Sequence, residues 1–182
     1  MSIFTNPAST SKENAQAYTD AILGLLGDRD PMPVLAGTAA AVRSSIAGLD
    51  RATLTRPEAP GKWSIAQVLQ HLADSDLVWG FRLRMTLAHD RPPIAGYDQD
   101  LWATRLHYEL ADAAEALEQF DVLRRANLRL VGRASRDELA RVQVHAERGE
   151  ESVAHSMLMY AGHDLLHVAQ VARIRAAVAP AT

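Results

Sequence analysis

Two histidines near the end of the chain have the residue type and the spacing of metal ligands. His163 and His167 stand four residues apart, so on a helix both imidazole rings leave the same face. At roughly 100° per residue that face also carries Tyr160, Gln170 and Ile174 and points inward. Two imidazoles on a buried stripe are costly unless their lone pairs are used, as a divalent metal ion would use them. The alternative is that both rings only hydrogen-bond to carbonyls or water.

A complete site needs a third ligand from another helix, and His71 is the best candidate. It lies at the flank of an apolar stripe that includes Ile65 and Trp79; the alternative is a histidine at the edge of the surface. Asp164 follows His163 where the zinc-protease motif has Glu, so a protease mechanism is not inferred. The sequence has no Glu-x-x-His pair, which disfavours a di-iron carboxylate bundle.

Three neutral imidazoles would leave a divalent ion its positive charge and an open position, which is the arrangement of a catalytic site. Water or a thiol is acidified at such a position and becomes a nucleophile near neutral pH. Because the chain has no cysteine, a thiol would have to arrive as a cosubstrate. All-nitrogen ligation suits Zn, Ni and Fe alike, so the metal is not distinguished.

Helix start and stop signals define the elements that must position these residues. Asp30 and Ser64 are expected N-caps, whereas Asp50–Gly61 and Ile94–Asp100 are expected loops. The patch Ala140–Val144 is strand-like but too short to found a sheet. Four long helices and a short N-terminal one predict an all-α antiparallel bundle. The expected helices are about Glu13–Leu26, Pro31–Ala47, Ile65–Asp90, Leu106–Val131 and Ser152–Val178, with a short helical piece at Asp137–Val142.

Length and composition exclude several classes of function. The 182 residues suit one domain over positions 1–182, and 48% of them are hydrophobic, as in a folded globular protein. The net charge of −3 argues against nucleic acid as a partner. The N-terminus lacks the pattern of a secretory signal, and the longest apolar helical stretch, Val153–Val171, is interrupted by polar residues. We therefore expect a cytoplasmic protein with a small-molecule substrate and no membrane partner.

Several short segments occur in an order and spacing that are specific in combination. They are Pro60–Ile65, His71–Asp76, Arg82–Met85, Tyr97–Ala103, Arg124–Leu130, His145–Ser152 and Tyr160–Gln170. Over about residues 18–176, the chain thereby resembles the DinB/YfiT-like superfamily, whose members are regarded as metalloenzymes.

The resemblance implies an up-down-down-up four-helix bundle, with one divalent metal ion held by three histidines. Carried over to this sequence, those ligands are His71, His163 and His167. The resemblance also implies a homodimer. Some members are thiol S-transferases that use a low-molecular-weight thiol such as bacillithiol or mycothiol, and others are damage-inducible. Thiol S-transferase-like chemistry is therefore the expected function, with a metal-dependent hydrolase or a non-catalytic, stress-related metal-binding protein as alternatives.

Four more residues are expected to line the pocket or support the ligands. Tyr160 and Gln170 flank the histidine pair on the inward face. His145 begins a His-x-x-x-Gly pattern that the family often shows, and Arg82 lies on the same flank of its helix as His71. The alternatives are ordinary helix packing and, for His145, a loop histidine.

Two charges fall on apolar stripes. Asp76 lies in the middle of the stripe that carries Leu72 and Trp79, and Arg124 lies on the stripe of Phe120. Because a lone buried charge costs several kcal/mol, we expect Asp76 and Arg124 to pair across the two middle helices. The alternative is that one helix is rotated and its charge reaches solvent.

Overall fold

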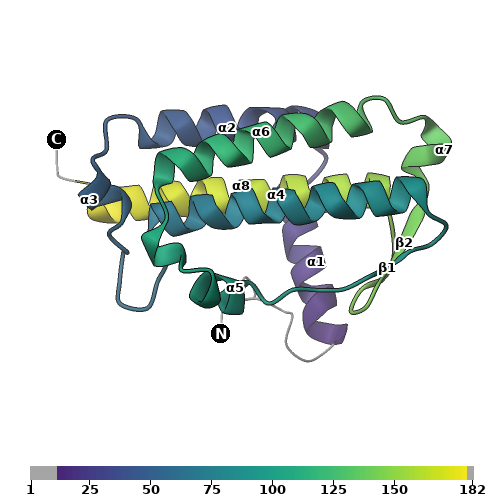
Figure 1. Cartoon of the computed structure of the whole chain (residues 1–182), viewed down its shortest axis with the longest axis horizontal. Coiled ribbons are helices and arrows are strands. Elements are labelled where there is room, and N and C mark those ends of the chain that lie inside the picture. Colours follow the sequence, from purple (N-terminus) through teal and green to yellow (C-terminus); the bar gives the residue numbers. More distant parts are fainter. Residues whose placement is uncertain (1–11, 180–182) are drawn as a thin grey trace.

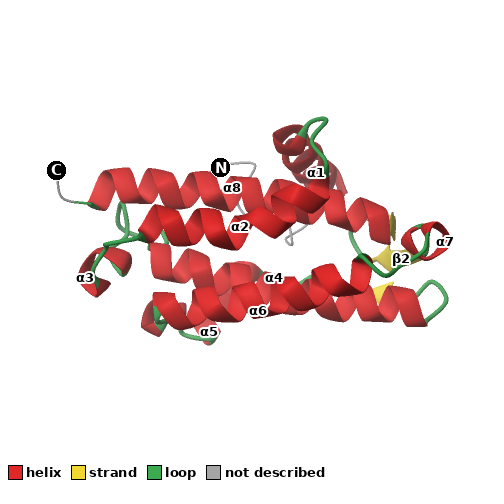
Figure 2. Cartoon of the chain, turned by 90° about the horizontal axis from the view of Figure 1, so that it is seen from above, coloured by secondary structure: helices red, strands yellow, loops and turns green. Residues whose placement is uncertain are grey.

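The structure is a computed structural model in which residues 12–179 are described. Its four long helices lie side by side as a bundle (Figures 1 and 2). Helices α2 and α8 run in one direction and α4 and α6 in the other, which gives the predicted up-down-down-up order (Figure 1). The long helices are α2 (Pro31–Ile46), α4 (Ile65–Ala88), α6 (Ala113–Val131) and α8 (Val153–Val178).

A shorter helix, α1 (Lys12–Leu26), packs against α8. Its close approach depends on Gly162, where an added Cβ would lie 2.2 Å from the carbonyl oxygen of Ile22. The absent side chain therefore allows α1 to touch the backbone of α8 beside His163.

The helix starts follow the predicted caps. The Asp30 carboxylate accepts the Met32 N–H at 2.9 Å. Ser64 and Gln67 form a reciprocal capping box: the Gln67 side chain accepts the Ser64 N–H at 2.9 Å, and the Ser64 hydroxyl accepts the Gln67 N–H at 3.4 Å. Both caps leave α2 and α4 with starts at the predicted residues.

The connection between α4 and α6 differs from the prediction. It contains β1 (Pro93–Ile94), helix α5 (Gln99–Arg105) and the 3₁₀ turn η1 (Tyr108–Leu110). The predicted helix from Leu106 was wrong at its start, because Asp112 caps α6 by accepting the Ala114 N–H at 2.9 Å. The predicted loop Asp50–Gly61 likewise contains a short helix, α3 (Arg51–Leu54).

A small sheet closes one end of the bundle, and the prediction that Ala140–Val144 could not found a sheet was wrong. Strand β2 (Val142–His145) pairs antiparallel with β3 (Gly149–Ser152) and parallel with β1. Gly149 makes the turn possible with a φ of +80°. The predicted helical piece at Asp137–Val142 shortens to α7 (Arg136–Leu139), because β2 takes up Val142.

Polar residues divide the core of the bundle into two apolar parts. On α4, one apolar cluster occupies positions up to Ala73 and the other begins at Trp79, with Asp76 between them. Arg124 on α6 and Asp164 on α8 lie between the same two clusters. The bundle therefore has a buried polar layer at mid-length.

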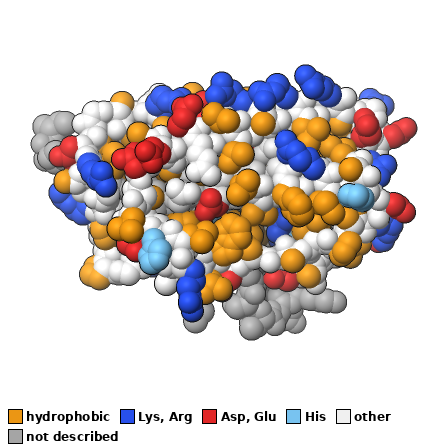
Figure 3. Space-filling view, viewed as in Figure 1, with side chains coloured by type: hydrophobic (Ala, Val, Ile, Leu, Met, Phe, Trp, Pro, Cys, Tyr) orange, Lys and Arg blue, Asp and Glu red, His pale blue; other side chains and the backbone are white. Residues whose placement is uncertain are grey.

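The outer face of α4 carries exposed apolar side chains. Leu77 is 50% exposed and Phe81 61%, and hydrophobic side chains gather on the side of the molecule that α4 faces (Figure 3). Within residues 12–179, none of the helices is long and apolar enough to cross a membrane.

Candidate metal centre

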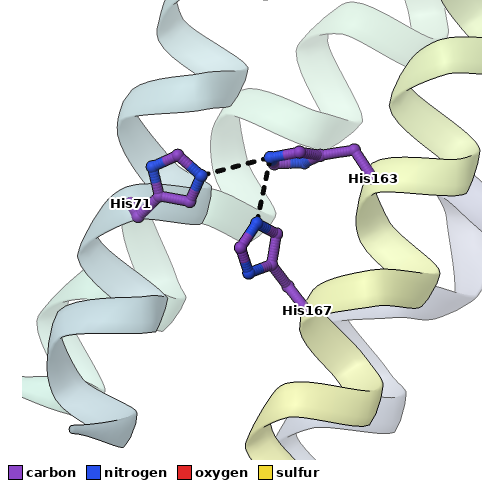
Figure 4. A group of neighbouring side chains, drawn as sticks. All are labelled: His71, His163 and His167. Carbon is purple, nitrogen blue, oxygen red and sulfur yellow. Dashed lines mark hydrogen bonds between the residues drawn. The ribbon is translucent and has the colours of Figure 1, made fainter. Parts of the chain in front are cut away.

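Three imidazoles from two helices converge at the inner face of the bundle. His71 comes from α4, and His163 and His167 come from successive turns of α8 (Figure 4). The Nε2 atom of His163 lies 3.1 Å from the Nε2 atom of His71 and 3.0 Å from that of His167. The structure thus brings together the three histidines that the sequence analysis selected as ligand candidates.

These rings are neutral in their surroundings. His71 is 1% exposed and His167 6%. Burial, together with the neighbouring imidazoles, holds the pKa values of His71 and His163 well below their usual range. Burial also lowers the pKa of His167 to about 4, against an opposing hydrogen bond from Gln170. Neutral imidazole is the form that binds metal ions.

Surrounding side chains set the orientation of the cluster. The Gln170 side-chain oxygen lies 2.7 Å from Nδ1 of His167. As an acceptor it places the His167 proton on Nδ1, so the Nε2 lone pair faces the other two rings. The Trp63 ring packs over His71, with the ring centroids 5.2 Å apart. One turn further along α4, Asp74 accepts a hydrogen bond from the Tyr108 hydroxyl at 2.5 Å. This bond holds the connection between α4 and α6 against α4.

The donor set fits a divalent ion. Two nitrogen ligands at about 2.0–2.1 Å from a tetrahedral ion lie about 3.3 Å from each other, close to the observed Nε2 separations of 3.0 and 3.1 Å. All three candidate ligand atoms lie within 4.8 Å of one another. A neutral imidazole has one proton, so the Nε2 atom of His163 can donate in these two contacts or accept in them, but it cannot do both.

The polar layer anchors α8 beside this cluster. Arg124 donates to Asp76 from Nη2 at 2.7 Å and from Nε at 3.1 Å, as predicted. It also donates to Asp164, from Nη2 at 3.0 Å and from Nη1. Sequence reasoning missed Asp164 as a partner, although its place four residues after Tyr160 and three before His167 puts it on the same buried stripe.

Burial and the ion pairs shift the pKa values of Asp76 and Arg124. Burial raises the pKa of Asp76 to about 6, opposed by the Arg124 charge and its hydrogen bonds. Burial acts to lower the pKa of Arg124, but both carboxylates act in the other direction and raise it overall. The guanidinium therefore stays charged, and it joins α4, α6 and α8 at the level of the histidines.

A cavity opens on one side of the cluster. His71 and His163 form part of its wall, and three of the other predicted pocket residues, Arg82, His145 and Tyr160, lie in the same wall. The remaining side chains come from α1, α4, the α4–α5 connection, the start of α5, the turn between β2 and β3, and α8: Tyr18, Ser75, Tyr97, Gln99, Glu147, Arg148 and Met159.

A second hollow lies on the other side of the cluster. Trp63, His167 and Gln170 contribute to its wall, together with the exposed segment around Lys62 and the α5 residues. The fourth predicted pocket residue, Gln170, therefore lies on this side. The histidine cluster separates two hollows, with His71 and His163 facing one and His167 facing the other.

Fold and site together define a four-helix bundle with a buried histidine cluster between two antiparallel helices. Residues 35–171 match the DinB superfamily, and the chain belongs to that family.

Known relatives and one solved structure agree with this assignment. A protein of Oceanobacillus iheyensis named "putative metal-dependent hydrolase" is 27% identical over 130 residues, which cover 71% of this chain and 75% of the relative. A Bacillus cereus protein of the same name is 28% identical over 135 residues, or 72% and 75% of the two chains. The structure of YfiT from Bacillus subtilis, described as "a probable metal-dependent hydrolase with an unusual four-helix bundle topology", has a TM-score of 0.74 at 21% identity and covers 95% of this chain and 92% of its own.

Proposed function

We propose that the protein is a metal-dependent enzyme whose single divalent ion is held by His71, His163 and His167. The observation that carries the proposal is the convergence of their Nε2 atoms at 3.0 and 3.1 Å in a buried setting. The neutral state of the three rings supports it, and so do the names of the relatives. Zn, Ni and Fe suit this donor set equally well.

We propose hydrolysis of a small molecule as the reaction. When bound, a divalent ion supplies Lewis acidity that makes water a better nucleophile near neutral pH. The chain's own groups would orient the ligands and take a proton from the water. Gln170 holds the His167 ring in place, and Glu147 offers a carboxylate in the wall of the cavity that His71 and His163 also line. The rings of Tyr97 and Tyr160 line the same cavity.

Thiol S-transfer, which the resemblance implied first, would use the same ion to activate a low-molecular-weight thiol. The names of the relatives give it no support, and the thiol would have to be a cosubstrate because the chain has no cysteine. An activity screen with and without added thiol separates the two reactions. Turnover that needs the thiol would replace hydrolysis by transfer, whereas full metal content without any turnover would favour a stress-related metal-binding protein.

We expect replacement of any one of the three histidines by Ala to lower metal content at least about tenfold, because two imidazoles hold a divalent ion poorly. The wild-type chain should carry about one ion, measured by elemental analysis after purification. His107→Ala is the matched control, since that ring is exposed and hydrogen-bonds to Glu109. Full metal content in the triple Ala variant, with its helical circular-dichroism signal intact, would show that the assignment is wrong.

The broader setting remains as the sequence suggested it. We propose a cytoplasmic, single-domain protein that forms a homodimer and acts on a small molecule rather than on nucleic acid. Analytical ultracentrifugation of the purified chain tests the dimer directly.

A further inference from the structure

Arg82 is a buried cation without a carboxylate partner in the described part of the chain. Its side chain projects from α4 into the wall of the cavity beside the histidine cluster, and the residue is 8% exposed. Its Nη2 donates to the Ala95 carbonyl oxygen at 2.7 Å, and the ion pairs found among residues 12–179 do not include it. A buried charge normally has a counter-charge, because desolvation costs several kcal/mol.

His145 adds an unused hydrogen-bond donor to the same wall. The residue is 2% exposed, and its Nδ1 accepts the Glu147 backbone N–H at 3.2 Å. Since a neutral imidazole carries one proton, that proton lies on Nε2. This buried Nε2 has no hydrogen-bond partner among the described residues, and such orphaned donors are rare in native proteins.

Two further charged side chains line the same cavity. Arg148 is also in the wall, but Glu151 neutralises it through bonds of 2.5 and 3.1 Å. Glu147 lines the cavity as well, yet it forms no ion pair with Arg82. Its carboxylate instead lies against Gly96, with an oxygen 2.6 Å from where a Cβ on that residue would be. Arg82 therefore faces the cavity without a carboxylate paired to it, although Glu147 lies in the same wall.

We propose that Arg82 and His145 form a binding site for the carboxylate of a substrate, next to the histidine cluster. The guanidinium supplies the charge and the His145 Nε2–H supplies a second, neutral donor. One cation beside a neutral donor suits a monoanion, whereas a phosphate dianion would bring more negative charge toward the Glu147 carboxylate of the same wall. As a statement about the substrate this rests on the proposed function, and it names the class: a small carboxylic acid whose reacting group reaches the histidine cluster while its carboxylate is held by Arg82.

The test uses the full-length chain freed of metal by a chelator, so that anion binding to a metal ion cannot contribute. Binding of acetate, acetamide and inorganic phosphate is measured by ¹⁵N-resolved NMR titration. We expect acetate to perturb the amides around Arg82 and His145. Acetamide should bind at least about tenfold more weakly than acetate, because one charge-assisted hydrogen bond accounts for such a factor. Equal binding of acetate and acetamide would overturn the proposal, and tighter binding of phosphate at the same residues would overturn its assignment to carboxylates.

Variants assign the binding to the two residues. Arg82→Gln and His145→Phe should each weaken acetate binding, the first by about tenfold or more. Arg84→Gln removes a charge from the same helix outside the cavity wall and should leave acetate binding unchanged. If Arg82→Gln does not fold, Arg82→Lys keeps the charge without the planar fork and should bind acetate with intermediate strength. Acetate affinity that is the same in all folded variants would overturn the proposal.

The outcome is separable from that of the proposed function. Acetate binding at Arg82 and His145 in a chain that takes up no metal would sustain the carboxylate site and contradict the metal centre. Stoichiometric metal in a chain that binds acetate no better than acetamide would support the metal centre and contradict the carboxylate site.

Discussion

Buried imidazoles make the stability of the folded chain depend on acidity. Burial lowers the pKa of both His145 and His167 to about 4, whereas an imidazole in an unfolded chain has a pKa of about 6.5. Between these values the two histidines bind more protons in the unfolded chain, so the stability that they contribute at neutral pH is lost as the pH falls through this window. The raised pKa of Asp76 acts in the opposite direction. For the metal-free chain, we expect the unfolding free energy from urea titrations to fall by up to about 1.4 kcal/mol per pH unit for each such histidine.

A matched pair of variants checks this origin. His145→Phe removes one buried base and should make the pH dependence less steep, whereas His89→Asn changes an exposed residue and should not. An identical pH slope in wild type and His145→Phe would contradict the coupling for that residue.

Single residues were predictable where helical spacing alone decides their neighbours. His163 and His167 follow from their separation along one helix, and Asp76 and Arg124 follow from charges placed on apolar stripes. The burial of His71 could not be predicted from helical spacing. It depends on Trp63 packing over the ring and on the connection between α4 and α6, which Tyr108 holds against α4. Trp63 lies before the helix that carries His71, and Tyr108 lies 34 residues from Asp74, so the apolar periodicity of that helix does not report either contact.

Among the helices, Arg124 acts as the connection that joins three of them. We expect Arg124→Met to destabilise the fold by about 3–5 kcal/mol, since it leaves the Asp76 and Asp164 carboxylates buried without their partner. Asp76→Asn should cost less, because Arg124 keeps its ion pair with Asp164. The double variant should lose less than the sum of the two, as measured by a double-mutant cycle in urea. Strictly additive losses would mean that the hydrogen bonds seen in the structure contribute no coupling.

Contact between α1 and α8 depends on the missing side chain of Gly162. We expect Gly162→Ala to destabilise the chain by about 1–3 kcal/mol, because its Cβ would overlap the Ile22 carbonyl and force α1 to move. Gly24→Ala in α1 is the matched control: nothing lies within 4 Å of its added Cβ, and replacing a helical glycine there should stabilise by about 0.5–1 kcal/mol. Thermal denaturation of both variants gives the comparison, and equal effects would argue against a close approach at Gly162.

Long helices were predictable as elements, and short ones were not. The caps Asp30 and Ser64 and the apolar spacing place α2 and α4 within two residues of their observed ends. Strands β1 to β3 pair residues that lie up to about 50 positions apart, so their stability comes from partners that a local pattern does not contain. The predicted start of α6 was too early. Asp98 caps α5 and Asp112 caps α6, and the predicted helix ran through the non-helical residues that separate α5 from α6.

For the whole molecule, the proposed ion would join α4 to α8 and so stabilise the bundle. At a free metal concentration about 100 times the dissociation constant, linkage adds about 2.7 kcal/mol to the unfolding free energy. In a chain of this size that corresponds to a rise in Tm of about 5–11 °C. Differential scanning calorimetry of metal-loaded and chelator-treated protein measures it, and the triple histidine-to-Ala variant should show no difference. A metal-dependent rise of equal size in that variant would place the ion elsewhere.

The order of the histidines along the chain has a consequence for how the protein is made. His71 precedes His163 by 92 residues, and at about 5–20 residues per second a ribosome takes roughly 5–20 s to cover that distance. During that interval α4 carries one imidazole without its two companions, and Arg124 lacks its second carboxylate on α8. A nascent chain halted before α8 therefore cannot assemble the cluster. An ion held by all three histidines is therefore acquired only once α8 has been made.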